Sequence, residues 1–349
     1  MSEALWPDAI GRLLRREELP VELVEQVMTA ILSGEATDAQ IAGFAVALRS
    51  KGETAAELAA LVRTMLRFAE RVDLSDVDGP IIDTCGTGGD RAGTVNVSTM
   101  AALVAAAAGA RVAKHGGRAA SSQCGSADVL EALGVVIDLG PDGVARSIRE
   151  VGIGFCFAPR FHAGLRFAAT ARRELGTPTT FNFAAPLANP AGVKRQIVGV
   201  SDPTMADRLV GMLAELGAER ALVFYGHDGL DELTVTTTST VHELRDGAIS
   251  VYDVDPTALG IPHADLTALA GGDAAGNAEV VHKVLAGAKG PIRDIVSLNA
   301  AAALLVAELV PDLGAGVELA GAILDDGRAA ATLDALVRVT VAARESGDT

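Results

Sequence analysis

The sequence predicts an α/β protein in which a small all-helical N-terminal domain is joined to a large α/β domain with a mostly parallel central sheet. Three observations support this prediction. Up to about residue 72, apolar side chains recur only at helical spacing. From Pro80 onward, short strand-like runs alternate with helix-like stretches, the pattern of parallel strands joined by crossover helices. A helical, loop-rich stretch over residues 160–195 interrupts this alternation.

The N-terminal helices are marked by their apolar spacing and by their first turns. Helical periodicity covers three segments: residues 21–32, 41–48 and 58–68. Thr37 with Gln40 and Thr54 with Glu57 have the capping-box pattern, a hydroxyl residue followed three positions later by an amide or a carboxylate. We therefore expect one helix to start after each threonine.

The α/β part is expected to begin with a strand near Ile81. Strands are expected at residues 81–83, 111–114, 135–137, 153–157, 197–200, 221–225, 233–244 and 248–254, the last two pairing antiparallel across Asp246-Gly247. Helices are expected from Ser98 and over residues 129–133, 142–151, 162–175, 205–216 and most of 275–345. We expect domains of residues 1–75, with 162–195 packed against them, and of residues 76–161 plus 196–349.

The composition excludes several classes of protein. With 349 residues, 49% hydrophobic and 21% charged, the chain is of ordinary globular type. The net charge of −16 argues against a nucleic-acid or acidic-membrane partner. The longest apolar run, Met100–Ala110, is too short for a membrane span, and no secretory signal is recognisable. Cys85, Cys124 and Cys156 are expected to be small buried hydrophobes, and the location to be cytoplasmic.

Two glycine-rich loops are the strongest functional signal. Gly86–Asp90 leads to Asn96–Thr99, and Lys114–Arg118 leads to Ser126; each run lies between a strand-like and a helix-like segment. Backbone N–H groups at a helix N-terminus favour anions, so two such loops predict a ligand with more than one phosphate. Tight structural turns and simple helix capping remain the alternatives.

Other charged groups suggest a metal and a carboxylate ligand. Asp231 and Glu232 are adjacent after an expected strand and suit Mg²⁺, which needs only one or two carboxylates beside phosphate oxygens; a surface acidic pair is the alternative. Arg172 and Arg173 suit a carboxylate, unless they form a solvated helix end. We expect His162 to be a helix-start or packed histidine rather than a catalytic base. Without a nucleophilic triad, a Cys/His metal set or a Walker motif, the chemistry is expected to rest on positioning and electrostatics.

Taken together, these motifs resemble the anthranilate phosphoribosyltransferase family over nearly the whole chain. The segments that carry the resemblance are residues 36–44, 86–90, 96–99, 114–134, 157–159, 172–176, 181–182, 186–190 and 228–233. The resemblance implies transfer of a 5-phosphoribosyl group from 5-phosphoribosyl 1-diphosphate to anthranilate in L-tryptophan biosynthesis. It also implies use of Mg²⁺ and a homodimer formed through the helical domain.

The resemblance also assigns residues to the site. The diphosphate-sugar positions are Gly86, Gly89, Asp90, Thr94, Asn96, Val97, Ser98, Thr99, Lys114, His115, Gly116, Gly117, Arg118, Ala119, Ala120, Ser121, Ser122 and Ser126. The Mg²⁺ positions are Ser98, Asp231 and Glu232. Arg172 matches the arginine that holds the anthranilate carboxylate, so Arg172 and Lys114 would act by orientation and charge.

Two positions depart from the family pattern. Gly117 stands where the family usually has Asn, and Ala185 where it usually has Gly before Pro-Leu. Both departures fall on the acceptor side of the site. The alternatives to the anthranilate enzyme are therefore a paralogue that uses a different aromatic amine, a non-catalytic ligand- or nucleic-acid-binding relative, and a pyrimidine-nucleoside phosphorylase.

Overall fold

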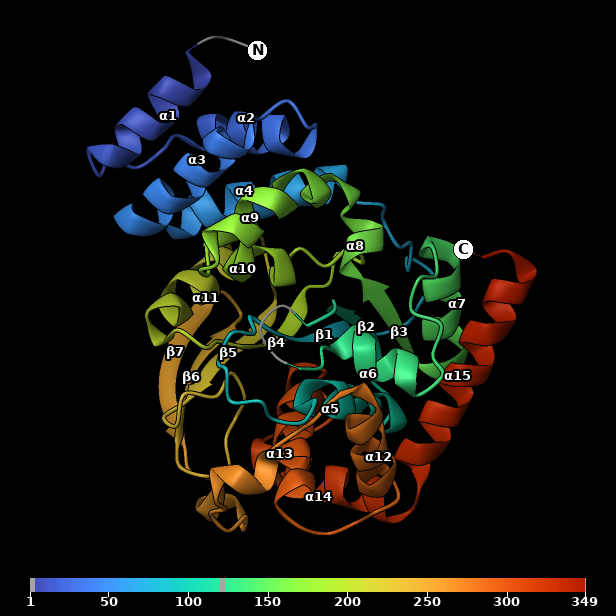
Figure 1. The fold of residues 1–349 in the computed structure, drawn as a ribbon. Helices are drawn as coiled ribbons and strands as arrows, with labels where there is room; N and C mark the ends of the chain where they lie inside the picture. Colours follow the sequence, from blue (N-terminus) through green and yellow to red (C-terminus); the bar gives the residue numbers. More distant parts are fainter. Residues whose placement is uncertain (1–3, 120–122, 349) are drawn as a thin grey trace.

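The chain begins with a layer of four helices. The computed structural model describes residues 4–119 and 123–348. The layer consists of α1 (Leu5–Leu14), α2 (Val21–Leu32), α3 (Asp38–Lys51) and α4 (Ala55–Phe68) (Figure 1). Both expected capping boxes are confirmed, because Thr37 caps α3 with Gln40 and Thr54 caps α4 with Glu57. The small helical N-terminal part of the prediction is therefore confirmed.

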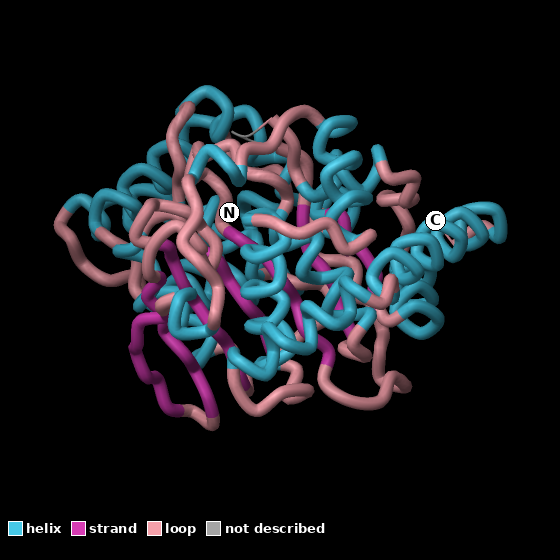
Figure 2. Tube along the Cα trace, turned by 90° about the horizontal axis from the view of Figure 1, so that it is seen from below, coloured by secondary structure: helices cyan, strands magenta, loops and turns pink. Residues whose placement is uncertain are grey.

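A seven-stranded sheet forms the centre of the molecule, in the order β3-β2-β1-β4-β5-β6-β7. Its strands are β1 (Ile81–Gly86), β2 (Arg111–Gly116), β3 (Ile153–Phe157), β4 (Arg195–Gly199), β5 (Arg220–Gly226), β6 (Ser239–Arg245) and β7 (Ala248–Val254). The neighbours from β3 to β5 are parallel, and only the last two pairings are antiparallel. Figure 2 shows the strands side by side. The mostly parallel sheet is confirmed.

Two strand predictions are wrong in part or whole. Residues 135–137 form no strand, since the Val135 N–H donates to the Leu130 carbonyl and the Val136 N–H to the Thr340 hydroxyl. The strand expected over 233–244 starts only at Ser239. In both places, groups other than a neighbouring strand take up backbone hydrogen bonds. The antiparallel turn is confirmed.

Helices cover both faces of the sheet. They are α5 (Val97–Ala107), α6 (Ser126–Ala132), α7 (Pro141–Val151), α8 (Ala158–Phe161), α9 (Ala169–Leu175), α10 (Thr180–Ala184), α11 (Ala206–Glu215), α12 (Ala274–Leu285), α13 (Pro291–Val306), α14 (Leu313–Asp325) and α15 (Arg328–Ser346). Short 3₁₀ turns are η1 (Ala163–Ala168), η2 (Ala185–Leu187), η3 (Pro203–Met205), η4 (Pro256–Leu259) and η5 (Leu266–Leu269). The single helix expected over 162–175 is thus divided into η1 and α9.

Alternate residues of the central strands serve two different cores. Ile197 and Leu222 lie in the cluster that contains α5 and α13, whereas Val198 and Val223 lie in the cluster that contains the N-terminal helices. Such alternation is what a sheet covered on both faces requires. The second of these clusters therefore joins the helical layer to one face of the sheet.

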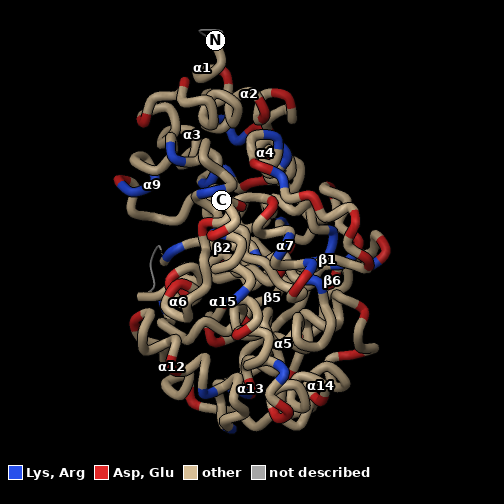
Figure 3. The backbone as a smooth tube through the Cα atoms, turned by 90° about the vertical axis from the view of Figure 1, so that its right-hand side faces the viewer, with Lys and Arg blue, Asp and Glu red and all other residues tan. Residues whose placement is uncertain are grey.

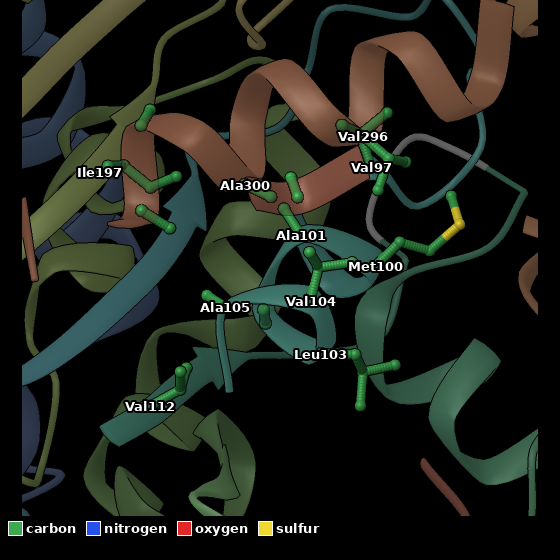
Figure 4. Packing of buried hydrophobic residues seen from close by; sticks show 14 of the residues in the cluster. Val97, Met100, Ala101, Leu103, Val104, Ala105, Val112, Ile197, Val296 and Ala300 are labelled. Atoms are coloured by element: carbon green, nitrogen blue, oxygen red, sulfur yellow. The ribbon is translucent and has the colours of Figure 1, made fainter. Parts of the chain in front are cut away.

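Alanine-rich α5 and α13 pack closely beneath the sheet. Ala101 of α5 and Ala300 of α13 are fully buried, and Figure 4 shows them at the contact between the two helices. This explains the longest apolar run as a buried helix. Within the described chain, no helix has the length and apolarity to cross a membrane. Acidic and basic residues are spread over both parts of the molecule (Figure 3).

Candidate active site

The two glycine loops meet at one edge of the sheet. β1 and β2 are parallel neighbours, so the loops that follow Gly86 and Gly116 leave the sheet side by side. The Asn96 side-chain amide donates to the Cys124 carbonyl at 3.1 Å. One hydrogen bond therefore ties the end of the first loop to the end of the second. All three cysteines are buried, as expected.

Lys114 supplies a buried cation between these loops. Its side chain is 2% exposed; its Nζ donates to the Thr84 carbonyl at 2.6 Å and lies 3.4 Å from the Ser98 hydroxyl. Burial lowers the pKa of Lys114, whereas the nearby carboxylates of Asp83 and Glu232 raise it. An anion bound at this edge would strengthen the charged form in the same way.

Asp231 and Glu232 face the first loop and the start of α5. The Gly88 N–H donates to Asp231 Oδ2 at 2.8 Å, and the Ser98 N–H donates to Glu232. Burial raises the pKa of both carboxyls; the neighbouring Asp90 raises that of Asp231 further, and Asp231 that of Glu232. The structure thus brings all three expected Mg²⁺ positions together.

These residues do not form a complete metal cage. Across residues 4–119 and 123–348, no group of three or more His, Cys, Asp or Glu side chains could hold a metal ion. The pKa values of the two crowded carboxyls stay raised although Lys114 lies near Glu232, and a divalent cation would add the counter-charge that favours both ionised forms. The donor set is all oxygen and incomplete, which fits Mg²⁺ that also takes phosphate oxygens and water.

Two glycines leave the space that Asp231 occupies. A Cβ atom on Gly86 would lie 2.8 Å from Asp231 Oδ2, and one on Gly199 would lie 1.6 Å from the Asp231 carbonyl oxygen. Ser201 donates from its hydroxyl to the Gly88 carbonyl at 2.7 Å. Our sequence reasoning missed Gly199 and Ser201. The only feature of the sequence that could have indicated them is that they lie at the carboxyl end of an expected strand.

Arg172 lies on α9, which packs against α3 of the helical layer. Burial lowers its pKa, and its guanidinium lies 6.0 Å from the centre of the Phe181 ring. Within the described residues, the guanidinium has no carboxylate partner. A half-buried cation of this kind is suited to a carboxylate ligand.

Two buried histidines connect the second loop to the segment around η2. His115 Nδ1 lies 3.1 Å from the Pro186 carbonyl oxygen, and His162 Nε2 lies 2.7 Å from that of Ala188. The two ring centres are 5.2 Å apart. Burial lowers the pKa of His115 to about 4 and that of His162 to about 3. Both rings are therefore neutral at pH 7, and His162 is packed as expected.

Some predicted site residues are placed differently or lie outside the described residues. The Arg118 guanidinium pairs with Asp128 at 2.9 Å and Glu131 at 2.8 Å, so its charge is already used on the protein surface. The three expected positions that lie outside the described residues are Ala120, Ser121 and Ser122. A Cβ on Gly117 would meet no atom of the described residues within 4 Å, so these residues leave room for a side chain at this position.

The fold and the site together define a glycosyltransferase. Residues 7–69 match the family model described as "Glycosyl transferase family, helical bundle domain", and residues 78–330 match "Glycosyl transferase family, a/b domain". The chain belongs to this family and, within it, to the anthranilate phosphoribosyltransferases. Anthranilate phosphoribosyltransferase of Acidothermus cellulolyticus is 56% identical, covering 97% of this chain and 96% of its own length.

Solved structures agree with this assignment. The anthranilate phosphoribosyltransferase of Thermus thermophilus has a TM-score of 0.90 and 41% identity, covering 96% of this chain and 99% of its own. The Saccharomyces cerevisiae enzyme in complex with PRPP and Mg has a TM-score of 0.89 and 27% identity, covering 98% and 99%. The yeast enzyme has also been solved in complex with 4-fluoroanthranilate, with a TM-score of 0.86, 25% identity and the same coverage.

Proposed function

We propose that the protein transfers the 5-phosphoribosyl group of 5-phosphoribosyl 1-diphosphate to anthranilate, giving N-(5-phosphoribosyl)anthranilate and diphosphate in L-tryptophan biosynthesis. The observation that carries this proposal is the buried Lys114, which lies between the two glycine loops with Glu232 among its nearby carboxylates. A cation, the backbone of two glycine-rich loops and two carboxylates at one sheet edge suit a magnesium diphosphate. The names of the relatives support the same reaction.

The donor is proposed to lie along the two loops. Its phosphates would receive hydrogen bonds from loop N–H groups, from the hydroxyls of Ser98, Thr99 and Ser126, and from Lys114. Ser98, Asp231 and Glu232 would hold Mg²⁺, which supplies charge stabilisation of the diphosphate when bound. Lys114, fixed by the Thr84 carbonyl, holds a positive charge where the leaving group gains negative charge, which favours the transition state.

The acceptor is proposed to be oriented from the helical side. Arg172 would bind the anthranilate carboxylate and direct the amine toward C1 of the ribose. The C1–N bond forms as the C1–O bond to diphosphate breaks; diphosphate leaves with the bonding electron pair, and the amine loses a proton. The neutral His115 and His162 keep this side of the site free of additional positive charge.

Incubation with both substrates and Mg²⁺ tests the proposed function. We expect anthranilate fluorescence to fall as the product forms, with chromatography identifying the product. No turnover at millimolar anthranilate would refute the proposal. A competition panel of substituted anthranilates distinguishes the anthranilate enzyme from the paralogue. The paralogue requires that another amine be preferred to anthranilate. Salt-sensitive oligonucleotide binding without turnover would support the non-catalytic reading instead.

We also propose that the protein is a cytoplasmic homodimer formed through the helical layer. Leu14 of α1 and Val46 of α3 are 74% and 45% exposed, and α1 packs against α3. Exposed apolar side chains on neighbouring helices suit burial by a second copy. Light scattering after size-exclusion chromatography should give the mass of a dimer; a monomer mass at micromolar concentration would contradict this proposal.

A further inference from the structure

A segment far along the chain lies against the first glycine loop. This segment, residues 269–272, is called the clamp. The Val95 N–H donates to the Leu269 carbonyl at 3.0 Å, and the Gly271 N–H donates to the Gly93 carbonyl at 2.8 Å. These two hydrogen bonds run in opposite directions between the segments. The clamp therefore holds the backbone of the first loop just before Asn96.

Asn277, in the first turn of α12, extends this contact with its side chain. It is 2% exposed. Its Oδ1 accepts the Gly272 N–H at 2.7 Å, and its Nδ2 donates to Asn96 Oδ1 at 2.9 Å. Because both ends of the buried amide have partners, the side chain is held in one orientation.

Asn96 carries the constraint to the second glycine loop. Its Oδ1 is occupied by Asn277, which leaves its Nδ2 to donate to the Cys124 carbonyl at 3.1 Å. An amide turned the other way would place two oxygens together at Cys124 and two N–H groups together at Asn277. The donor of Asn277, which makes the shorter contact to an oxygen that the Cys124 thiol approaches at 3.5 Å, therefore helps to determine which end of Asn96 meets the second loop.

We propose that Asn277 is a positioning residue for the diphosphate-sugar site, acting through Asn96 to set the spacing between the two glycine loops. The inference rests on the proposed function, in which one diphosphate donor is bound by both loops. A ligand that spans two loops is sensitive to their separation, because its contacts cannot all form when the spacing changes. Asn277 itself lies on α12, outside both loops.

The isosteric variant Asn277→Asp removes the donor to Asn96 while keeping the acceptor for Gly272. We expect the Kd for 5-phosphoribosyl 1-diphosphate with Mg²⁺, measured by calorimetry, to rise roughly three- to tenfold, as expected for one lost hydrogen bond. The donor KM should rise by the same factor, with the anthranilate KM unchanged at saturating donor. If N277D does not fold, Asn277→Ser, which also lacks a donor that reaches Asn96, carries the same expectation.

Two comparisons separate positioning from general destabilisation. Asp273→Ala removes the N-cap of the same helix, where Asp273 accepts the Gly276 N–H at 2.8 Å, and should lower the melting temperature without changing the donor Kd. In an Asn96→Ala background, N277D should have no further effect on the donor Kd. An equal loss of affinity in D273A, or an undiminished N277D effect without Asn96, would overturn the inference.

Wild-type measurements keep this inference distinct from the proposed function. Turnover with anthranilate reports the proposed function alone, whereas donor binding is measured without an acceptor. Donor binding weakened by N277D supports the positioning role even if anthranilate is not the acceptor. Unchanged donor binding in a folded N277D protein refutes the positioning role even if the wild type makes the expected product.

Discussion

Replacing Gly199 with Ala should lower activity by displacing Asp231, without substituting any residue proposed to bind the substrate or Mg²⁺. Gly199 ends β4, where its Cα faces the backbone of Asp231. An added Cβ would lie 1.6 Å from the Asp231 carbonyl oxygen and 2.5 Å from its carbonyl carbon. Since side-chain Cβ atoms essentially never come within 3.0 Å of such an atom, the backbones of β4 and Asp231 must separate by about 1.4 Å.

The displacement should lower activity strongly while leaving the protein folded. A misplacement of about 1 Å in a catalytic arrangement costs on the order of 100-fold in rate, equivalent to about 2.7 kcal/mol of transition-state stabilisation. Overpacking in a core costs about 1–3 kcal/mol of folding free energy. We therefore expect a folded G199A protein whose kcat is about 100-fold lower and whose Mg²⁺ requirement is raised.

The assay is the loss of anthranilate fluorescence over a Mg²⁺ titration, with circular dichroism to confirm folding. Gly321→Ala is the matched control, because a Cβ there would lie 3.5 Å from the end of the Arg293 side chain, an ordinary contact on α14. Wild-type kcat and Mg²⁺ dependence in G199A would show that the position of Asp231 does not control the reaction.

Three further outcomes are expected. Asp231→Asn combined with Glu232→Gln should abolish Mg²⁺-dependent turnover in steady-state assays while leaving the circular dichroism spectrum intact; unchanged activity would remove the metal assignment. Gly117→Asn, which has open space for its side chain among the described residues, should lower the anthranilate KM roughly three- to tenfold by adding a hydrogen bond, and a raised KM would show that no such bond forms. Because burial lowers the pKa of His162 to about 3, the unfolded state binds more protons between about pH 3 and 6.5, so stability rises with pH over this interval. His162→Gln, which keeps a donor for the Ala188 carbonyl, should reduce that rise by roughly 5 kcal/mol in urea unfolding at each pH; an unchanged slope would contradict the pKa.

Elements with a local signal were predicted well. The capping boxes at Thr37 and Thr54 depend on residues three positions apart, so the sequence alone contained all their partners. Residues 135–137 look equally strand-like, yet the Val136 N–H donates to Thr340, 204 positions away. A strand exists only where a neighbour supplies its hydrogen bonds, and no local pattern reports that neighbour.

The candidate site also contains residues that a local pattern indicates and residues that it does not. Gly86, Lys114 and the Asp231-Glu232 pair could be picked out because they lie at or after the carboxyl ends of expected strands, where ligands bind in parallel sheets. Arg118 could not be judged from its type, since the fold pairs it with two carboxylates. Gly199 was missed because its importance comes from the Asp231 backbone, which passes close to it. That contact exists only in the folded chain.

The sequence by itself determined the helical layer, the mostly parallel sheet and the two loops at strand ends, because hydrophobic period and turn chemistry act over a few residues. Only the tertiary structure decided how the loops are joined to the rest of the site. The Gly88 N–H meets Asp231 across 143 positions and Asn277 meets Asn96 across 181. Such contacts depend on the order of strands in the sheet and on the packing of α12. Neither can be predicted from a local sequence pattern.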